Sequence, residues 1–177
     1  MYFEIKKGNI IKAKVDAIVN PSNNTLSCSE GLCAAIFEEA GYNDLKRECN
    51  LYQYCQTGKS IMTYGYSLNA KHIIHTVGPN YCTNTQPNIE LKNAYLSSLK
   101  LADENDLKTI AFPCISTGFH EFPLKEACLI ALKAIKNYIP KSLEKCYLYC
   151  YSKKEYQAYK KSLQKLLSQI MDTNKQL

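Results

Sequence analysis

Short apolar runs alternate along this chain with longer segments of helical periodicity. Strands are expected at residues 2–6, 14–20, 61–68, 72–77, 108–115 and 144–151. Helices are expected at residues 31–40, 42–51, 90–105, 124–138 and 153–171, where apolar residues recur every three or four positions. Such alternation predicts an α/β fold with a largely parallel sheet covered on both faces. The 177 residues fit one domain at 1–172, followed by a frayed tail at 173–177.

Several protein classes are excluded by composition. No apolar run approaches the roughly 20 residues of a membrane span, and residues 1–7 are too short and polar for a secretion signal. We therefore expect no membrane partner. The nine cysteines are odd in number and form no Cys-x-x-Cys pair, which argues against a disulfide scaffold or a zinc site. We expect reduced thiols in an intracellular, cytoplasmic protein, with the nucleus left open, and no bound metal.

The chain is moderately basic. Its 22 Lys and Arg residues exceed its 16 Asp and Glu residues, giving a net charge of +6. Much of the excess lies in the last third, as in Lys153-Lys154 and Lys160-Lys161. A solvated helix face accounts for this pattern. No basic motif is dense enough to predict nucleic-acid binding, which is the weakest functional hypothesis.

Four polar segments border the predicted strands and could meet on one rim: residues 8–11, 20–31, 116–123 and 151–153. In the second of these, the apolar run at residues 15–19 ends in the cluster Asn20-Pro21-Ser22-Asn23-Asn24. Ligands of open α/β sheets bind beyond the carboxyl ends of the strands. An uncharged amide suits a sugar hydroxyl or an ordered water better than a metal ion.

The segment at residues 116–123 favours phosphate binding. Ser116, Thr117 and Gly118 supply hydroxyls and backbone N–H groups just before a helix, and Pro123 suits a first helical turn. Backbone amides at a helix start favour phosphate, although a simple strand-to-helix turn is the alternative interpretation. Gly31 offers a second such turn. The spacing is neither that of a P-loop nor that of the dinucleotide-binding Gly-x-Gly-x-x-Gly pattern.

Several of these blocks resemble the macrodomain family. Residues 15–23 resemble its signature VDAIVNAAN, and residues 8–11 resemble its GDIT. Four further segments also resemble sequence segments of the family and occur in the same order: residues 55–66, 72–79, 111–118 and 151–159. The resemblance implies a three-layer α/β/α fold with a mixed, mostly parallel central sheet. It also implies binding of ADP-ribose; many members remove ADP-ribose from proteins or deacetylate O-acetyl-ADP-ribose.

The resemblance implies roles for individual residues at both ends of the ligand. Asn9, with Ile10 beside it, stands where family members have an acidic residue that accepts a hydrogen bond from the adenine amino group. An Asn oxygen can accept the same hydrogen bond, without charge assistance. Tyr151 takes the aromatic position near adenine. Asn23 matches the residue that contacts the distal ribose and helps place a water. Asn20 is grouped with the ligand-binding residues, although its better role is to hold the loop in shape.

The two loops expected to wrap the diphosphate follow the same correspondence. The residues implied are Gly31, Leu32 and Cys33 in one loop, and Ser116, Thr117, Gly118, Phe119 and His120 in the other.

The chain departs from the family pattern at three places. Residues 29–33 lack two usual glycines, Cys33 replaces an Asp credited with activating water, and Glu121 stands where a Gly is usual. Hydrolysis would then rest on Asn23, the substrate phosphate and a held water. Cys33 could instead be a thiolate nucleophile with His120 as its base, or simply a small loop residue facing phosphate. Glu30 is either a general base or a solvent-facing acid.

We therefore hypothesise an enzyme that hydrolyses ADP-ribosyl ester bonds on proteins or acetate, with Asn23, Cys33 and His120 as its catalytic candidates. The alternative is a module that binds ADP-ribose without turnover. Either function needs ADP-ribose or an ADP-ribosylated protein as partner and no cofactor, and we expect a monomer.

Overall fold

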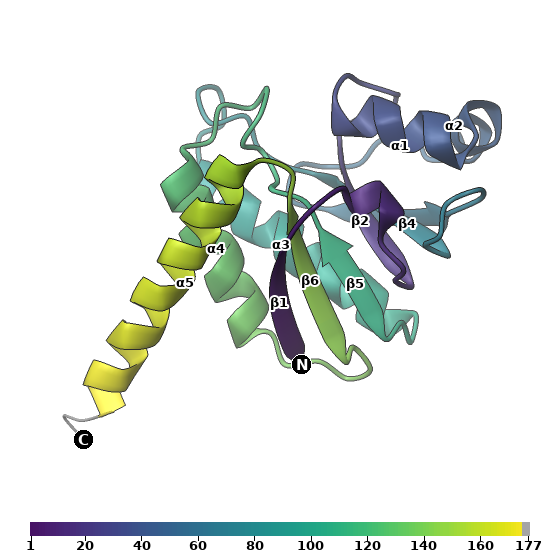
Figure 1. Ribbon diagram of the computed structural model, residues 1–177. Helices are drawn as coiled ribbons and strands as arrows, with labels where there is room; N and C mark the ends of the chain where they lie inside the picture. Colours follow the sequence, from purple (N-terminus) through teal and green to yellow (C-terminus); the bar gives the residue numbers. More distant parts are fainter. Residues whose placement is uncertain (175–177) are drawn as a thin grey trace.

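The computed structural model describes residues 1–174, and these form six strands, five α-helices and one short 3-10 helix (Figure 1). The strands are β1 (Tyr2–Lys7), β2 (Ala17–Ser22), β3 (Ser60–Tyr64), β4 (His72–Val77), β5 (Thr109–Phe112) and β6 (Lys145–Cys150). The helices are η1 (Ile10–Lys12), α1 (Leu32–Ala40), α2 (Tyr42–Cys49), α3 (Pro87–Glu104), α4 (Leu124–Asn137) and α5 (Lys153–Asn174). Of the tail expected at 173–177, residues 175–177 lie outside the described residues.

The strands form one sheet in the order β1-β6-β5-β2-β4-β3. All neighbouring strands run parallel except β3, which pairs antiparallel with β4. The predicted alternation of strands and helices and the mixed, mostly parallel sheet are confirmed, with shifts at the element ends. One such shift is at residues 8–11, expected as a loop, where η1 begins at Ile10.

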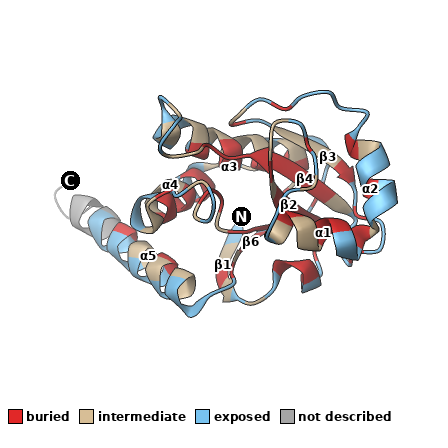
Figure 2. Ribbon diagram, turned by 90° about the horizontal axis from the view of Figure 1, so that it is seen from above, coloured by how far each residue is buried: buried red, intermediate tan, exposed pale blue. Residues whose placement is uncertain are grey.

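Helices cover both faces of the sheet. One core cluster joins it to α3, α4 and α5 through side chains such as Tyr95, Leu132 and Tyr159. The other joins it to η1, α1 and α2 through side chains such as Phe37 and Leu45. Seen from above, α3 and α1 lie on opposite sides of β2 and β4, and the outer sides of α2 and α5 are exposed (Figure 2). The three-layer α/β/α arrangement is confirmed.

Strand β2 continues two residues beyond its expected end at Asn20. Pro21 and Ser22 stay in register with Thr76 and Val77 of β4. On its other side, β2 pairs with β5 at Ala17 and Ile18, opposite Ile110 and Ala111. A proline is tolerated where a strand has no ladder partner on one side, so Pro21 does not end β2.

The separation of β2 from β5 opens the sheet at one end. After β2 the chain continues on the β4 side of the sheet, and after β5 it continues on the β6 side. The connections that follow the neighbouring strands β2 and β5 therefore run in opposite directions. Such a topological switch point is where open α/β sheets bind ligands, outside the carboxyl ends of the strands. In Figure 1 this is the upper end of the sheet, where α1 and the start of α5 also lie.

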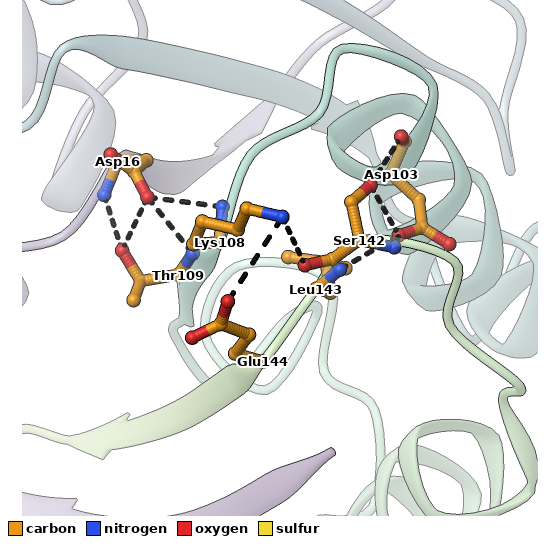
Figure 3. A network of polar contacts seen from close by, with 7 residues as sticks. All are labelled: Asp16, Asp103, Lys108, Thr109, Ser142, Leu143 and Glu144. Atoms are coloured by element: carbon orange, nitrogen blue, oxygen red, sulfur yellow. Dashed lines mark hydrogen bonds and ion pairs between the residues drawn. The ribbon is translucent and has the colours of Figure 1, made fainter.

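Two carboxylates, the half-buried Asp16 and the buried Asp103, hold the loops at the opposite end of the sheet (Figure 3). Asp16 accepts hydrogen bonds from the backbone N–H groups of Lys108 and Thr109. Asp103 accepts three, from the N–H groups of Lys141, Ser142 and Leu143, at 2.7–2.9 Å. Burial alone would raise the pKa of Asp103, but these N–H donors outweigh it and hold the pKa well below its usual range. This network keeps β5 and β6 aligned at the end remote from the switch point.

No helix within residues 1–174 is both long and apolar enough to cross a membrane. All nine cysteines lie in the described part of the chain and are free thiols.

Candidate functional site

A cleft of about 850 Å³ lies at the carboxyl ends of β1, β6, β5 and β2. All four polar segments expected to form one rim contribute to it. The lining residues are Gly8, Asn9, Ile10, Ile11, Pro21, Ser22, Asn23, Ser29, Glu30, Gly31, Leu32, Cys33, Ala35, Pro113, Cys114, Ser116, Thr117, Gly118, Phe119, His120, Tyr149, Tyr151 and Glu155. Every predicted ligand-contact residue except Asn20 is among them. Four neighbouring strands span about 14 Å at the usual strand spacing, so the cleft is elongated across the sheet.

Asn20 does not line the cleft, because its side chain is fully buried. Its amide nitrogen lies 3.0 Å from Nδ1 of His75 and 3.5 Å from Sγ of Cys33. Nε2 of His75 lies 3.0 Å from the hydroxyl of Thr63. Burial lowers the pKa of His75 to about 3, so its ring is neutral. Asn20 therefore supports the cleft floor from below, which corrects its grouping with the ligand contacts.

One wall of the cleft is the loop that leads into α1. Within residues 1–174, the backbone N–H groups of residues 29–33 make no hydrogen bond, and α1 has no side-chain cap. Gly31 has a φ of 67°, in the left-handed region that favours glycine. This conformation turns the chain so that the uncapped start of α1 faces the cleft. Free N–H groups at a helix start attract anions.

The facing wall is the loop at residues 116–122. Its carbonyl groups take the internal hydrogen bonds: Ser116 accepts from the N–H of Phe122, and Gly118 accepts from that of Glu121. The carbonyl of His120 accepts from the N–H of Tyr81. The N–H groups of residues 116–120, in contrast, have no partner in the described chain. Two rows of unpaired N–H groups therefore border the same cleft.

Two hydroxyls in the cleft are buried and unpaired. Oγ of Ser22 and Oγ of Ser116 have no hydrogen-bond partner among the described residues. Buried polar atoms are normally satisfied, so these two hydroxyls are available for a ligand or an ordered water. Ser22 was missed by sequence reasoning because the strand was expected to end before it.

The side chain of Asn23 is largely occupied by its own loop. Its oxygen accepts hydrogen bonds from the hydroxyl of Thr25 at 3.0 Å and the backbone N–H of Ser27 at 3.1 Å. Its nitrogen donates to the hydroxyl of Ser27 at 2.9 Å and the carbonyl of Ser27 at 3.2 Å. Asn23 thus lines the cleft and shapes its own loop, and both of its N–H groups are already engaged by Ser27.

The proposed pair of Cys33 and His120 is not assembled as a hydrogen bond. Both residues line the cleft, yet no hydrogen bond joins them within the described residues. The thiol of Cys33 is 1% exposed and accepts from Asn20. A nucleophile and its base belong within hydrogen-bond reach of each other. In this structure Cys33 instead contacts Asn20 and supports the floor of the cleft.

The other end of the cleft is apolar and aromatic. Ile10 and Ile11 are buried beneath it, and Tyr151 is 81% exposed above it. Asn9 caps η1: its side-chain oxygen accepts the backbone N–H of Ile11 at 3.0 Å. The oxygen that was expected to face a ligand amino group is thus engaged in the cap.

Sequence reasoning also missed Tyr149 and Glu155 in this part of the cleft. The carboxylate of Glu155 accepts hydrogen bonds from the backbone N–H and the hydroxyl of Ser152 at 2.8 and 2.9 Å. The hydroxyl of Ser152 in turn accepts from the N–H of Glu155. The spacing Ser-x-x-Glu at a helix start is the signature of a capping box and could have been read from the sequence.

The lining of the cleft carries no cation. None of the described lining residues is Lys or Arg, and Glu30 and Glu155 are acidic. No cluster of His, Cys, Asp or Glu suited to a metal ion occurs in the part of the chain that the structure describes. An anion would therefore be held by backbone N–H groups and hydroxyls rather than by a charged side chain.

Comparison with known proteins gives one family. The profile described as Macro domain matches residues 19–131. An uncharacterized protein of Fusobacterium nucleatum is 42% identical over 174 residues, which cover 94% of this chain and 99% of that protein. The human ADP-ribose glycohydrolase MACROD2 is 38% identical, over 96% of this chain and 41% of that longer protein. A solved Trypanosoma brucei macrodomain in complex with ADP-ribose is similar at a TM-score of 0.83 and 35% identity, over 92% of this chain and 69% of that one.

Proposed function

The chain belongs to the macrodomain family, and from this premise we propose that it binds ADP-ribose in the cleft and hydrolyses ADP-ribosyl ester bonds. The observation that carries the proposal is the pair of facing loops at residues 29–33 and 116–120. Both loops leave their N–H groups unpaired within the described chain. Such groups suit a diphosphate, which is the central part of ADP-ribose.

The remaining parts of the ligand have matching surfaces on either side of these loops. The apolar and aromatic end, with Ile10 and Tyr151, suits the adenine ring. The end at Asn23, Ser22 and His120 suits the distal ribose, because hydroxyl and amide groups recognise sugar hydroxyls. The ligand would then lie across the ends of four strands.

Hydrolysis is supported by relatives such as human MACROD2, which is named an ADP-ribose glycohydrolase. In this chain the catalytic power would come from placement and electrostatics. The unpaired hydroxyl of Ser22 is placed to hold a water or a ribose hydroxyl beside the scissile bond. Asn23 would join it by exchanging its donation to the carbonyl of Ser27, at 3.2 Å, for one to the ligand. The substrate phosphate, fixed by the loops, would orient the attacking water.

A binding module without turnover is the second candidate. Two observations favour it: the Asn23 side chain is engaged by Thr25 and Ser27, and the thiol of Cys33 occupies a position where a carboxylate is usual. Both candidates share the same ligand and differ only in whether a bond is broken.

The decisive experiment is calorimetric titration with ADP-ribose, followed by an assay of ADP-ribose release from a mono-ADP-ribosylated protein and of acetate release from O-acetyl-ADP-ribose. Asn23→Ala should abolish release, whereas Thr25→Ala removes two loop hydrogen bonds, to Asn23 and Ser27, but keeps the amide and should retain release. Tight binding with no release of either kind would leave only the binding module. Absence of ADP-ribose binding would refute both candidates.

We also propose that the protein works inside the cell and as a monomer. Nine free thiols support a reducing, intracellular compartment such as the cytoplasm. A monomer suffices for this function, because the described chain supplies every wall of the cleft. Size-exclusion chromatography with light scattering tests that part directly.

A further inference from the structure

The two ends of the cleft differ in chemistry, and this difference assigns them to different parts of a ligand. Residues 29–33 and 116–120 present unpaired N–H groups at one end. The other end combines the buried side chain of Ile10 with the exposed ring of Tyr151. A flat apolar and aromatic surface suits a heteroaromatic base. The purine of the proposed ligand therefore lies at the end that contains Asn9.

The orientation of the Asn9 amide follows from the cap that it makes. Its side chain faces the backbone N–H of Ile11 at 3.0 Å, and only the oxygen of an amide can accept from that donor. Nδ2 must then point away from the cap. Asn9 is exposed at the rim, and its Nδ2 makes no hydrogen bond to any described residue. The group that Asn9 offers to a ligand is thus an N–H donor, together with the second lone pair of its oxygen.

We propose that Asn9 relaxes the choice of purine, so that the cleft accepts 6-oxopurine as well as 6-aminopurine diphosphoriboses. This inference rests on the proposed binding of ADP-ribose. The edge of adenine offers the N1 acceptor beside an N6–H donor. The edge of hypoxanthine offers the O6 acceptor beside an N1–H donor. The fixed Nδ2–H donor of Asn9 finds an acceptor on either base: N1 of adenine, or O6 of hypoxanthine one position further along the edge.

A carboxylate at this position would discriminate between the two bases. Carboxylate oxygens only accept, so they pair with the amino group of adenine and repel the O6 oxygen of a 6-oxopurine. Asp is also as good an N-cap as Asn. The substitution Asn9→Asp therefore keeps the cap on Ile11 and replaces the N–H donor by an oxygen. Its added negative charge acts on both diphosphates alike, so the ratio of the two affinities reports the base.

Glu155 is the charged side chain that lines this end of the cleft. One of its oxygens is held by both donors of Ser152, which fixes the carboxylate at the start of α5. Its second oxygen can accept from N6–H of adenine or from N1–H of hypoxanthine. The substitution Glu155→Gln separates its contribution from that of Asn9.

The test compares ADP-ribose with its analogue that carries hypoxanthine in place of adenine, by calorimetric titration of the full chain. For the native protein the two dissociation constants should agree within about threefold. Asn9→Asp should favour ADP-ribose by about tenfold or more, the usual cost of one mismatched donor–acceptor pair. Glu30→Gln, at the phosphate end, should shift both affinities by the same factor. The thermal midpoint of Asn9→Asp should equal that of the native protein.

The outcomes separate this inference from the proposed function. If the native protein binds neither ligand, the proposed function fails. If it binds ADP-ribose well and the hypoxanthine analogue at least tenfold more weakly, the relaxed choice of base is refuted while the function stands. An unchanged ratio in Asn9→Asp, or a ratio that moves only in Glu155→Gln, would overturn the role of Asn9.

Discussion

The amide nitrogen of Asn20 lies 3.5 Å from the sulfur of Cys33, in the buried layer beneath the cleft. The same nitrogen lies 3.0 Å from Nδ1 of His75. Cys33, Asn20 and His75 therefore form a buried series of contacts that runs from the cleft floor into the core, with the thiol at the cleft end. This placement gives Cys33 a supporting role, and among the described residues its thiol is hydrogen-bonded to an amide rather than to a general base.

Replacing Cys33 by Ala should therefore affect stability more than chemistry. The variant leaves Asn20 without its sulfur acceptor and opens a small void, which costs about 1–2 kcal/mol of unfolding free energy. Release of ADP-ribose should stay within about threefold of the native rate, measured on a mono-ADP-ribosylated protein. A loss of a hundredfold or more with ADP-ribose affinity intact would establish the thiol as a nucleophile instead.

The buried ring of His75 predicts a loss of stability in mild acid. Burial lowers its pKa from 6.5 to about 3 in the folded protein. Below pH 6.5 the unfolded chain binds a proton that the folded protein does not, so the unfolding free energy falls as the pH falls from 6.5 toward 3. The slope is about 1.4 kcal/mol per pH unit. Urea denaturation between pH 6.5 and 5.0 should show a drop of about 1.6 kcal/mol, because His75 of the unfolded chain is already half protonated at pH 6.5.

The matched variant is His75→Gln, which keeps a polar side chain between Asn20 and Thr63 but does not titrate. Between pH 6.5 and 5.0 its unfolding free energy should fall less than that of the native protein, and the difference is the contribution of His75. Parallel profiles for the two proteins would show that His75 is not the group responsible.

Much of the fold could be predicted from the sequence because its elements are strongly patterned. The apolar run at residues 110–112 is buried on both faces, as a central parallel strand must be. The rim segments were predictable for the same reason, since the carboxyl ends of parallel strands share one edge. The family blocks then indicated which residues of the rim face the cleft.

The misplacement of Asn20 has an identifiable cause. Ending the strand at Asn20 placed this residue at the rim, whereas the observed strand runs on to Ser22. Side chains two positions apart share a strand face, so Asn20 lies with Ile18 and Ser22 under α1. Whether Pro21 could stay in the strand depended on β5 diverging from β2, which local sequence does not reveal. The orientation of the Asn9 amide likewise depends on η1, which was expected as a loop.

We expect the stability of the protein to depend strongly on the negative charge of Asp103, at the end of the sheet remote from the cleft. Asp103→Asn replaces one acceptor oxygen by an NH₂ group that faces the N–H donors of residues 141–143. The loss of charge-assisted bonds should lower the unfolding free energy by about 3 kcal/mol. ADP-ribose affinity at 15 °C should be unchanged, because the network is remote from the cleft. Asp106→Asn, an exposed neighbour, is the control and should change stability by less than about 0.5 kcal/mol.

The loop at residues 116–122 contains a position where glycine should be better than alanine. Glu121 has a φ of 50°, and an L side chain in this left-handed region costs about 1 kcal/mol. At most positions Gly is less stable than Ala by about 0.5–1 kcal/mol, because the unfolded chain is freer. Here the order should reverse, with Glu121→Gly more stable than Glu121→Ala by about 0.5 kcal/mol. Both variants remove the same weak contact to the thiol of Cys82, so the difference in their unfolding free energies isolates the backbone. Equal stabilities, or the ordinary order with Ala ahead, would show that the loop adopts another conformation in solution.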